Sequence, residues 1–127
     1  MTYSVLKLNA NDISVSVHRW KPTESPIGCI QIIHGMMEHG KRYNELATFL
    51  NSKGFIVYCL DQRGHGLTSQ TTGLGILGSN TTWMTLLSDF HLVTQHIKQE
   101  SPSLPYFILG HSMGSYEALH YSILHPT

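Results

Sequence analysis

One short run of residues in this sequence has the composition and spacing of a nucleophilic site. Gly110-His111-Ser112-Met113-Gly114 follows the pattern Gly-x-Ser-x-Gly, which places a serine at the sharp turn from a strand into a helix. We therefore expect Ser112 to be the nucleophile of an acyl-transfer reaction, with Gly110 and Gly114 supporting the turn.

The residues on either side of this run favour the same interpretation. Residues 105–109 form a short apolar and aromatic segment after a break rich in serine and proline, which is typical of a buried strand. Residues 113–124 contain no proline and no glycine after Ser115, and their apolar spacing predicts a helix that ends near Pro126. The serine therefore lies in the strand–turn–helix context that the motif requires.

An acyl-transfer serine also needs two backbone N–H groups that stabilise the developing oxyanion. One donor belongs to the residue after the serine, here Met113, and the other to a loop that follows an earlier strand. His34-Gly35-Met36-Met37-Glu38-His39 follows the apolar run 28–33, so we expect Met36 to supply the second donor. Gly35 allows a tight turn there, and His34 is expected to pack or hydrogen-bond within this loop.

A third polar segment, Asp61-Gln62-Arg63-Gly64-His65-Gly66, follows another apolar run at residues 55–60. Ligands of open α/β sheets bind at the carboxyl ends of the strands. We therefore expect all three segments to meet at one edge of the sheet. The methionines near this edge, Met36, Met37 and Met113, are expected to line an acyl pocket or to pack in the core.

The elements that must position these segments alternate along the chain. Antiparallel strands are predicted at residues 3–8 and 13–20, joined by a hairpin-like connection, and buried strands at 28–33, 55–60 and 105–109. Helices are predicted at 41–52, 82–99 and 113–124, with Trp83 and Phe90 on the apolar stripe of the second, and a long loop at 61–80. This order predicts an α/β fold with a mostly parallel sheet and helices on both faces.

Composition excludes several classes of function. The formal net charge is zero, and the sequence contains no basic block that would suggest a nucleic-acid partner. No apolar stretch is long enough to span a bilayer, and no signal peptide is visible at the N-terminus. Cys29 and Cys59 lie in apolar runs and are expected to be buried free thiols, which favours a cytoplasmic location.

The sequence implies no metal and no other cofactor. Neither His34 and His39 nor His91 and His96 have the i, i+4 spacing of a helical zinc motif. The glycines at 64 and 66 are not followed by the Gly-Lys-Ser/Thr of a phosphate-binding loop.

The three motifs, in their order and spacing, resemble the α/β-hydrolase superfamily. More narrowly, they resemble its branch of monoacylglycerol lipases and lysophospholipases, also called serine aminopeptidase-like hydrolases, and they correspond to the N-terminal half of that fold. The resemblance implies a carboxylic ester hydrolase that acts on acylglycerols, lysophospholipids or small esters through an acyl-enzyme. It assigns Ser112 as the nucleophile, the N–H groups of Met36 and Met113 as the oxyanion hole, and Asp61, Arg63 and His65 as structural loop residues.

In this family the acid and the general-base histidine follow the elbow in the chain. After Ser112 the sequence offers only Glu117, His120 and His125, and His120 lies roughly 10 Å along the helix axis from the serine. A general base must lie within about 3 Å of the hydroxyl. We therefore expect a single partial domain, residues 1–127, that ends after the elbow helix and is inactive alone. The alternative is a non-catalytic truncated remnant or a fragment of a split protein.

The strand before the elbow is central in the family. Here we expect Phe107, Ile108 and Leu109 to lie on an unpaired apolar edge, which favours poor solubility or self-association.

Overall fold

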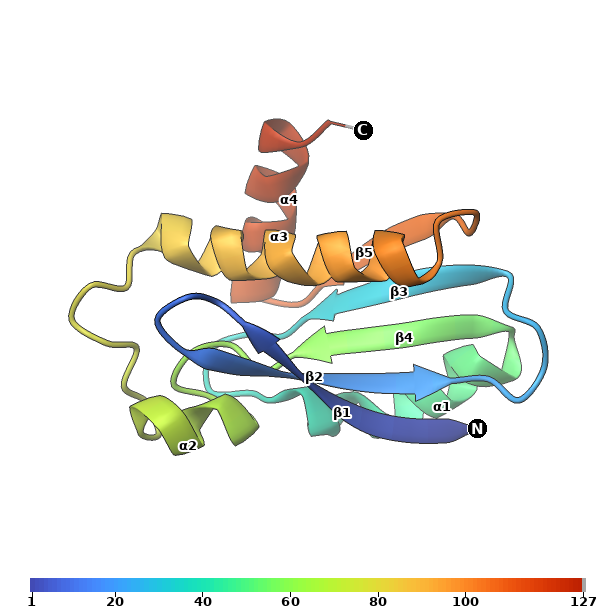
Figure 1. The fold of residues 1–127 in the computed structure, drawn as a ribbon, viewed down its shortest axis with the longest axis horizontal. Helices are drawn as coiled ribbons and strands as arrows, with labels where there is room; N and C mark the ends of the chain where they lie inside the picture. The colour runs from blue at the N-terminus through green and yellow to red at the C-terminus, as the bar shows by residue number, and fades with distance from the viewer. Residues whose placement is uncertain (127) are drawn as a thin grey trace.

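A five-stranded mixed sheet forms the centre of the computed structural model, which describes residues 1–126 apart from the side chain of Thr71 (Figure 1). The strands are β1 (Thr2–Asn9), β2 (Ser14–Lys21), β3 (Gly28–Ile33), β4 (Phe55–Leu60) and β5 (Tyr106–Gly110). The α-helices are α1 (Asn44–Ser52), α2 (Ser69–Thr72), α3 (Trp83–Glu100) and α4 (Met113–Leu124), and two 3₁₀ turns are η1 (Gly40–Tyr43) and η2 (Gly66–Thr68).

The strands lie in the order β1-β2-β4-β3-β5. β1 and β2 form an antiparallel hairpin, and β2 pairs antiparallel with β4. β3 lies between β4 and β5 and runs parallel to both. The predicted N-terminal hairpin and the predicted parallel strands are therefore confirmed, and the carboxyl ends of β3, β4 and β5 meet at one rim.

Helices cover both faces of the sheet, as predicted (Figure 1). Successive side chains of a strand point to opposite faces. Cys29 and Ile56 therefore pack on the α3 side with Val93, whereas their neighbours Ile30 and Val57 pack on the α1 side. α4 lies on the α3 side, where Tyr121 packs with Phe90 and Ile33. Both cysteines are free and buried, as expected.

Two local expectations were wrong. The segment expected to be a loop at 61–80 contains η2 and α2, because the Asp61 carboxylate accepts the N–H of Leu67 at 2.8 Å and thereby folds the chain back on itself. Trp83 was expected on the buried stripe of α3, but it is 37% exposed. Its Nε1 donates to His120 Nδ1 at 2.9 Å, because the first turn of α3 contacts α4 instead of the sheet.

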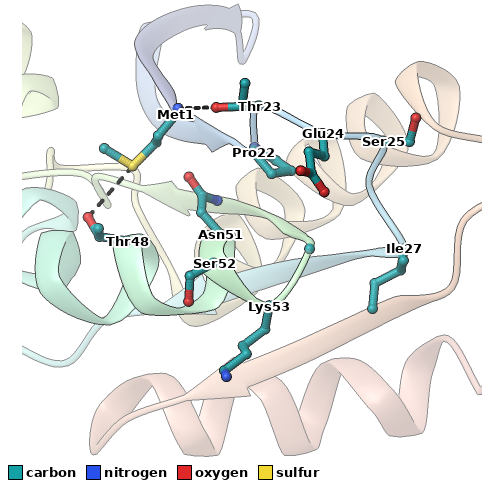
Figure 2. A pocket seen from close by; sticks show the side chains of 11 residues that line it. Met1, Pro22, Thr23, Glu24, Ser25, Ile27, Thr48, Asn51, Ser52 and Lys53 are labelled. Carbon is teal, nitrogen blue, oxygen red and sulfur yellow. Dashed lines mark hydrogen bonds between the residues drawn. The ribbon is translucent and has the colours of Figure 1, made fainter.

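The amino ends of β3 and β4 border a cavity of about 620 Å³. Figure 2 shows that the segment Pro22–Ile27 and the C-terminal part of α1 line it. In open α/β sheets, ligands bind at the opposite, carboxyl ends of the strands, so this cavity lies away from the predicted site. Within residues 1–126, no helix has the length and hydropathy needed to cross a membrane.

Candidate active site

Ser112 occupies the turn between β5 and α4 with a strained backbone. Its φ is 55° and its ψ is −120°, a conformation that a non-glycine residue adopts only at a cost of about 1–3 kcal/mol. Its side chain is exposed. A Cβ on Gly110 would collide with the carbonyl of Gly114, and a Cβ on Gly114 with the carbonyl of Ile33. The two flanking glycines are therefore required by close backbone contacts.

The loop after β3, here called the oxyanion loop (residues 34–39), lies directly against this turn. A Cβ built on Gly35 would lie 3.0 Å from Ser112 Cβ and 3.2 Å from the carbonyl oxygen of His111. Met36 and Met113 line one small cavity together with Leu77 and Leu86. The structure thus brings together the three residues that the sequence analysis placed at one site, Ser112, Met36 and Met113.

His34 orients the peptide that carries the Met36 N–H. Its Nε2 accepts the N–H of Gln62 at 3.0 Å, so the proton of the neutral ring is on Nδ1, which donates to the Gly35 carbonyl at 2.7 Å. Because the peptide is planar and trans, the Met36 N–H points away from that carbonyl. Within residues 1–126, neither Met36 nor Met113 donates its N–H to a protein acceptor. Both groups are therefore available to a ligand.

His34 cannot act as the general base in this arrangement. Burial lowers its pKa to about 4, although the hydrogen bond to Gly35 raises it. Both ring nitrogens are already occupied by backbone groups. Its role is the one expected from the sequence, a hydrogen-bonding residue of the loop.

Glu38 holds the oxyanion loop from the other side. Its Oε1 accepts the N–H of Gly35 at 2.9 Å and the hydroxyl of Tyr43 at 2.6 Å, and His111 Nδ1 lies 3.1 Å from its Oε2. Burial opposes ionisation of this carboxyl, but the hydrogen bonds outweigh burial and lower its pKa to about 2. The sequence analysis gave Glu38 no role, although an acidic residue three positions after a loop glycine was an available signal.

The loop after β4 supports the oxyanion loop through His65 and Asp61. His65 Nε2 accepts the N–H of Met37 at 3.0 Å. The Asp61 carboxylate lies 2.8 Å from His18 Nε2 and accepts the N–H of Gly40 at 2.6 Å. These bonds fix the relative position of the two loops, in agreement with the structural role that the resemblance implies.

Arg63 ties the same loop to the remainder of the fold. It is buried and donates to Asp89 at 2.7 and 3.0 Å and to Asp12 at 2.5 and 2.9 Å. The hydrogen bonds to Asp89 and Asp12 raise the pKa of Arg63, so its charge is permanent. A bidentate arginine–carboxylate pair is both directional and strong.

No base candidate of α4 reaches the serine. The Ser112 hydroxyl makes no hydrogen bond to residues 1–126. His120 accepts from Trp83, His125 stacks on His91 with ring centroids 4.3 Å apart, and Glu117 is buried. The expected methionine packing is confirmed only in part, because Met36 and Met37 are exposed and do not pack in the core.

Comparisons with known proteins identify the family. A family model described as serine aminopeptidase, S33, matches residues 24–127. Human monoglyceride lipase is 37% identical over 114 residues, which cover 84% of this chain and 34% of the human protein. The monoacylglycerol lipase of Mycolicibacterium smegmatis is 32% identical over 108 residues, with 84% of this chain and 36% of the relative covered. The chain thus spans about a third of the length of these relatives.

Solved structures agree with the sequence comparisons. A thermostable carboxyl esterase from Bacillus coagulans in complex with glycerol aligns over 100% of this chain and 42% of its own, with a TM-score of 0.89 and 32% identity. A soluble variant of monoglyceride lipase from Saccharomyces cerevisiae aligns over 96% of this chain and 39% of its own, with a TM-score of 0.81 and 26% identity. These matches, together with the elbow and its oxyanion loop, show that the chain belongs to the serine aminopeptidase S33 family of α/β-hydrolases.

Proposed function

We propose that this chain carries the nucleophile and the oxyanion hole of a carboxylic ester hydrolase. The Ser112 oxygen attacks the ester carbonyl carbon while its proton passes to a general base, and the carbonyl oxygen becomes an oxyanion. The N–H groups of Met36 and Met113 donate to that oxyanion. As the tetrahedral intermediate collapses, the base returns the proton to the leaving oxygen, so the alcohol departs and an acyl-enzyme remains. Water, deprotonated by the same base, then attacks the acyl carbon, which releases the carboxylic acid and restores the Ser112 hydroxyl.

One observation carries this proposal. A serine with positive φ occupies the elbow, and a loop whose Met36 N–H has no acceptor among the described residues touches it. Ordinary strand–helix turns have no need of such strain, which is characteristic of functional sites.

The substrate class that we propose is a small acyl ester or an acyl lipid such as a monoacylglycerol or lysophospholipid. The side chains of Met36, Met113, Leu77 and Leu86 give an apolar surface to a small cavity of about 20 Å³ beside the expected oxyanion donors, which Gln62, Arg63 and His65 also line. Relatives in two organisms carry the names monoglyceride lipase and monoacylglycerol lipase. No metal or other cofactor enters this reaction.

A second candidate is a non-catalytic fragment, either a truncated remnant or one part of a split protein. It is favoured by the position of the described histidines, since none donates to or accepts from the Ser112 hydroxyl. A serine without a base remains protonated at neutral pH and reacts slowly. On this view residues 1–127 alone do not hydrolyse esters.

A fluorophosphonate probe with mass-spectrometric mapping tests the proposal. The protein to test is one in which the acid and the histidine of the family follow residue 127. We expect the probe to label it at Ser112 and to leave its Ser112→Ala variant unlabelled. Ser115→Ala, which alters the neighbouring serine, is the matched control and should be labelled normally. The gene sequence past the Thr127 codon shows whether such residues follow in frame.

Two results would count against these statements. If the acid and histidine are present and Ser112 still resists the probe, the hydrolase proposal is wrong. If residues 1–127 alone are labelled at Ser112 as fast as an active hydrolase, the proposed dependence on a separate base is wrong.

We further propose that residues 1–127 self-associate through β5 and that the protein is cytoplasmic. In the described residues β5 pairs only with β3, and Phe107 and Leu109 are exposed. An unpaired apolar strand is a template for another chain. If light scattering at high concentration shows a monomer, the proposed self-association is wrong. If the protein is secreted with oxidised cysteines, the proposed cytoplasmic location is wrong.

A further inference from the structure

The part of the chain that runs from η2 to the second turn of α3 carries no charged side chain. Residues 66–88 contain no Asp, Glu, Lys, Arg or His, although 13% of the whole chain is charged. The charged residues that come next in the sequence on either side, Arg63 and Asp89, are paired with each other at 2.7 Å. This segment therefore presents an uncharged surface to its surroundings.

Large apolar side chains are exposed within the same segment. In the loop after α2, Leu74 is 76% exposed and Ile76 is 58% exposed. At the start of α3, Trp83 is 37% exposed and Met84 is 53% exposed. Single exposed apolar residues are common on proteins, but several within one short uncharged segment indicate an interaction surface.

The exposed loop, residues 73–82, satisfies part of its own backbone. The N–H of Gly75 donates to the Gly64 carbonyl at 2.8 Å, and the N–H of Ile76 donates to the Gly73 carbonyl at 3.1 Å. A polar group that leaves water costs free energy unless it is hydrogen-bonded. These internal bonds therefore lower the cost of moving the loop into less polar surroundings.

The N-terminus of α3, which follows this loop, is also capped without charge. The Thr82 hydroxyl accepts the N–H of Thr85 at 3.3 Å, and the Thr85 hydroxyl accepts the N–H of Thr82 at 3.1 Å. The second position of such a capping box is usually Glu or Gln, but the first turn of α3 contains no acidic residue. The end of the helix therefore adds only neutral polar groups to the surface.

The loop lies at the same end of the sheet as the candidate active site. Figure 1 shows that the chain between α2 and α3 extends beyond the arrowheads of β3 and β4. Leu77, within the loop, lines the small cavity that Met36 and Met113 also line. The cavity at the opposite, amino end of the sheet is lined instead by charged residues, among them Glu24 and Lys53. The uncharged surface is thus specific to the end that carries Ser112.

We propose that residues 73–84 are a docking element for an uncharged lipid surface. Leu74 and Ile76 enter the hydrocarbon region, whereas Trp83 lies at the level of the headgroups, where tryptophan is enriched. A docking element rich in Lys and Arg would select anionic lipids, and this segment has neither. Delivery of an acyl lipid to Ser112 by this element rests on the proposed function, but the docking itself does not.

Cosedimentation of the full-length protein with vesicles of phosphatidylcholine, which has no net charge, tests the proposal. We expect binding that added phosphatidylserine does not strengthen and added salt does not weaken, because the segment has no basic side chain. Leu74→Asp should lower the partition coefficient by roughly tenfold or more, since a charge replaces an apolar side chain that leaves water on docking. Phe49→Asp is the matched control, because Phe49 is 57% exposed on α1, away from the loop, and it should bind like the wild type.

A second variant tests the docking without risk to the fold. Met84→Asp places an acidic residue in the first turn of α3, where a negative charge is favourable for a helix. Thermal unfolding should therefore show a protein at least as stable as the wild type, while its binding to the vesicles decreases.

Trp83 provides an independent signal of docking. Trp20 is fully buried, whereas Trp83 is partly exposed, so the emission of Trp83 should shift to shorter wavelength when vesicles are added. Trp83→Phe should remove this shift and keep most of the binding measured by cosedimentation. A wild-type protein that binds the vesicles without any change that Trp83→Phe removes would contradict the proposed docking element.

Three further results would show that the proposal is wrong. The first is that the wild type does not bind phosphatidylcholine vesicles, and the second is that binding requires anionic lipid. The third is that Leu74→Asp and Met84→Asp bind as tightly as the wild type.

The docking and the proposed hydrolase activity are tested separately. Ser112→Ala should bind vesicles like the wild type. Leu74→Asp should hydrolyse a soluble short-chain ester at the wild-type rate but a monoacylglycerol in vesicles more slowly. If the wild type hydrolyses neither ester and still binds the vesicles through Leu74, the proposed function is wrong and the docking element stands.

Discussion

The two halves of the candidate site are supported in opposite ways. The loops after β3 and β4 are held by buried polar side chains whose partners come from distant parts of the chain, such as Arg63 with Asp12 and Asp89. The elbow, in contrast, is held by backbone contacts at Gly110 and Gly114, and the outer faces of β5 and α4 are apolar and exposed.

This difference shows that, within the described residues, polar side chains determine the geometry of the two loops, whereas backbone packing determines the geometry of the elbow. On the loop side most polar side chains already have hydrogen-bond partners, since its carboxylates and imidazoles bond to one another and to the backbone. The elbow side depends on close packing at its base, whereas Tyr116, Leu119 and Ile123 on its outer face are 70%, 65% and 71% exposed. Substitutions on the loop side should therefore act through charge and those on the elbow side through shape.

The largest effect is expected from Arg63→Ala on the loop side. The substitution leaves Asp89, which is 4% exposed, as an unpaired buried charge, so the free energy of unfolding should fall by about 3–5 kcal/mol. Urea denaturation measures it. Lys21→Ala, which breaks a partly exposed pair with Glu100, is the control and should lower it by less than about 1 kcal/mol.

A double variant sharpens this prediction. Arg63→Met combined with Asp89→Leu removes both charges, so the protein should be less destabilised than with Arg63→Ala alone. An equal or greater loss would show that the loop side is held by packing and not by charge.

A smaller effect is expected from Gly114→Ala on the elbow side. The added methyl group would meet the carbonyl carbon of Ile33 at 2.6 Å and the carbonyl oxygen of His34 at 2.8 Å. Overpacking of this kind should reduce the free energy of unfolding by about 1–3 kcal/mol and displace the oxyanion loop. Gly75→Ala is the matched control, because a Cβ there would meet no atom within 4 Å although the φ is +75°. It should lower the free energy of unfolding through backbone strain alone, by about 1–2 kcal/mol. If Gly114→Ala leaves both the free energy of unfolding and the NMR signals of the oxyanion loop unchanged, the geometry of the elbow does not depend on close packing at Gly114.

The smallest effect on folding is expected from Phe107→Lys at the exposed edge of β5. Phe107 is 51% exposed, and the aromatic contact it loses is an edge-to-face one with Phe55, with centroids 6.2 Å apart, so stability should change by about 1 kcal/mol or less. Self-association measured by light scattering should decrease, because a lysine on an edge strand opposes pairing with another chain. Leu119→Lys, on the outer face of α4, should leave the association unchanged if β5 is the interface.

The sequence was sufficient for most of the fold because its signals are local. Alternation in β1 and β2, apolar runs in β3, β4 and β5, and helical spacing in α1, α3 and α4 each report burial within a few neighbouring residues. α2 was missed because its fold-back depends on Asp61, eight residues before it, and Trp83 was misplaced because periodicity does not tell which neighbour a helix face meets.

The candidate site divides along the same line. Gly-x-Ser-x-Gly, and the glycine of the loop after β3, are local requirements of a tight turn, so the sequence was sufficient to predict that Ser112, Met36 and Met113 lie together. The roles of Glu38 and Gln62 could not, because each depends on a residue from another loop or strand.

The sequence by itself determined the order of the elements, the strained serine and the family, since these are written in spacing and in residues that only certain backbone conformations accept. Only the tertiary structure decided that the His34 imidazole is hydrogen-bonded and neutral. It also decided that the Glu38 carboxyl is ionised and that the Glu117 carboxyl is buried. Protonation depends on burial and on partners brought together from distant segments, and neither is encoded in any short stretch of the chain.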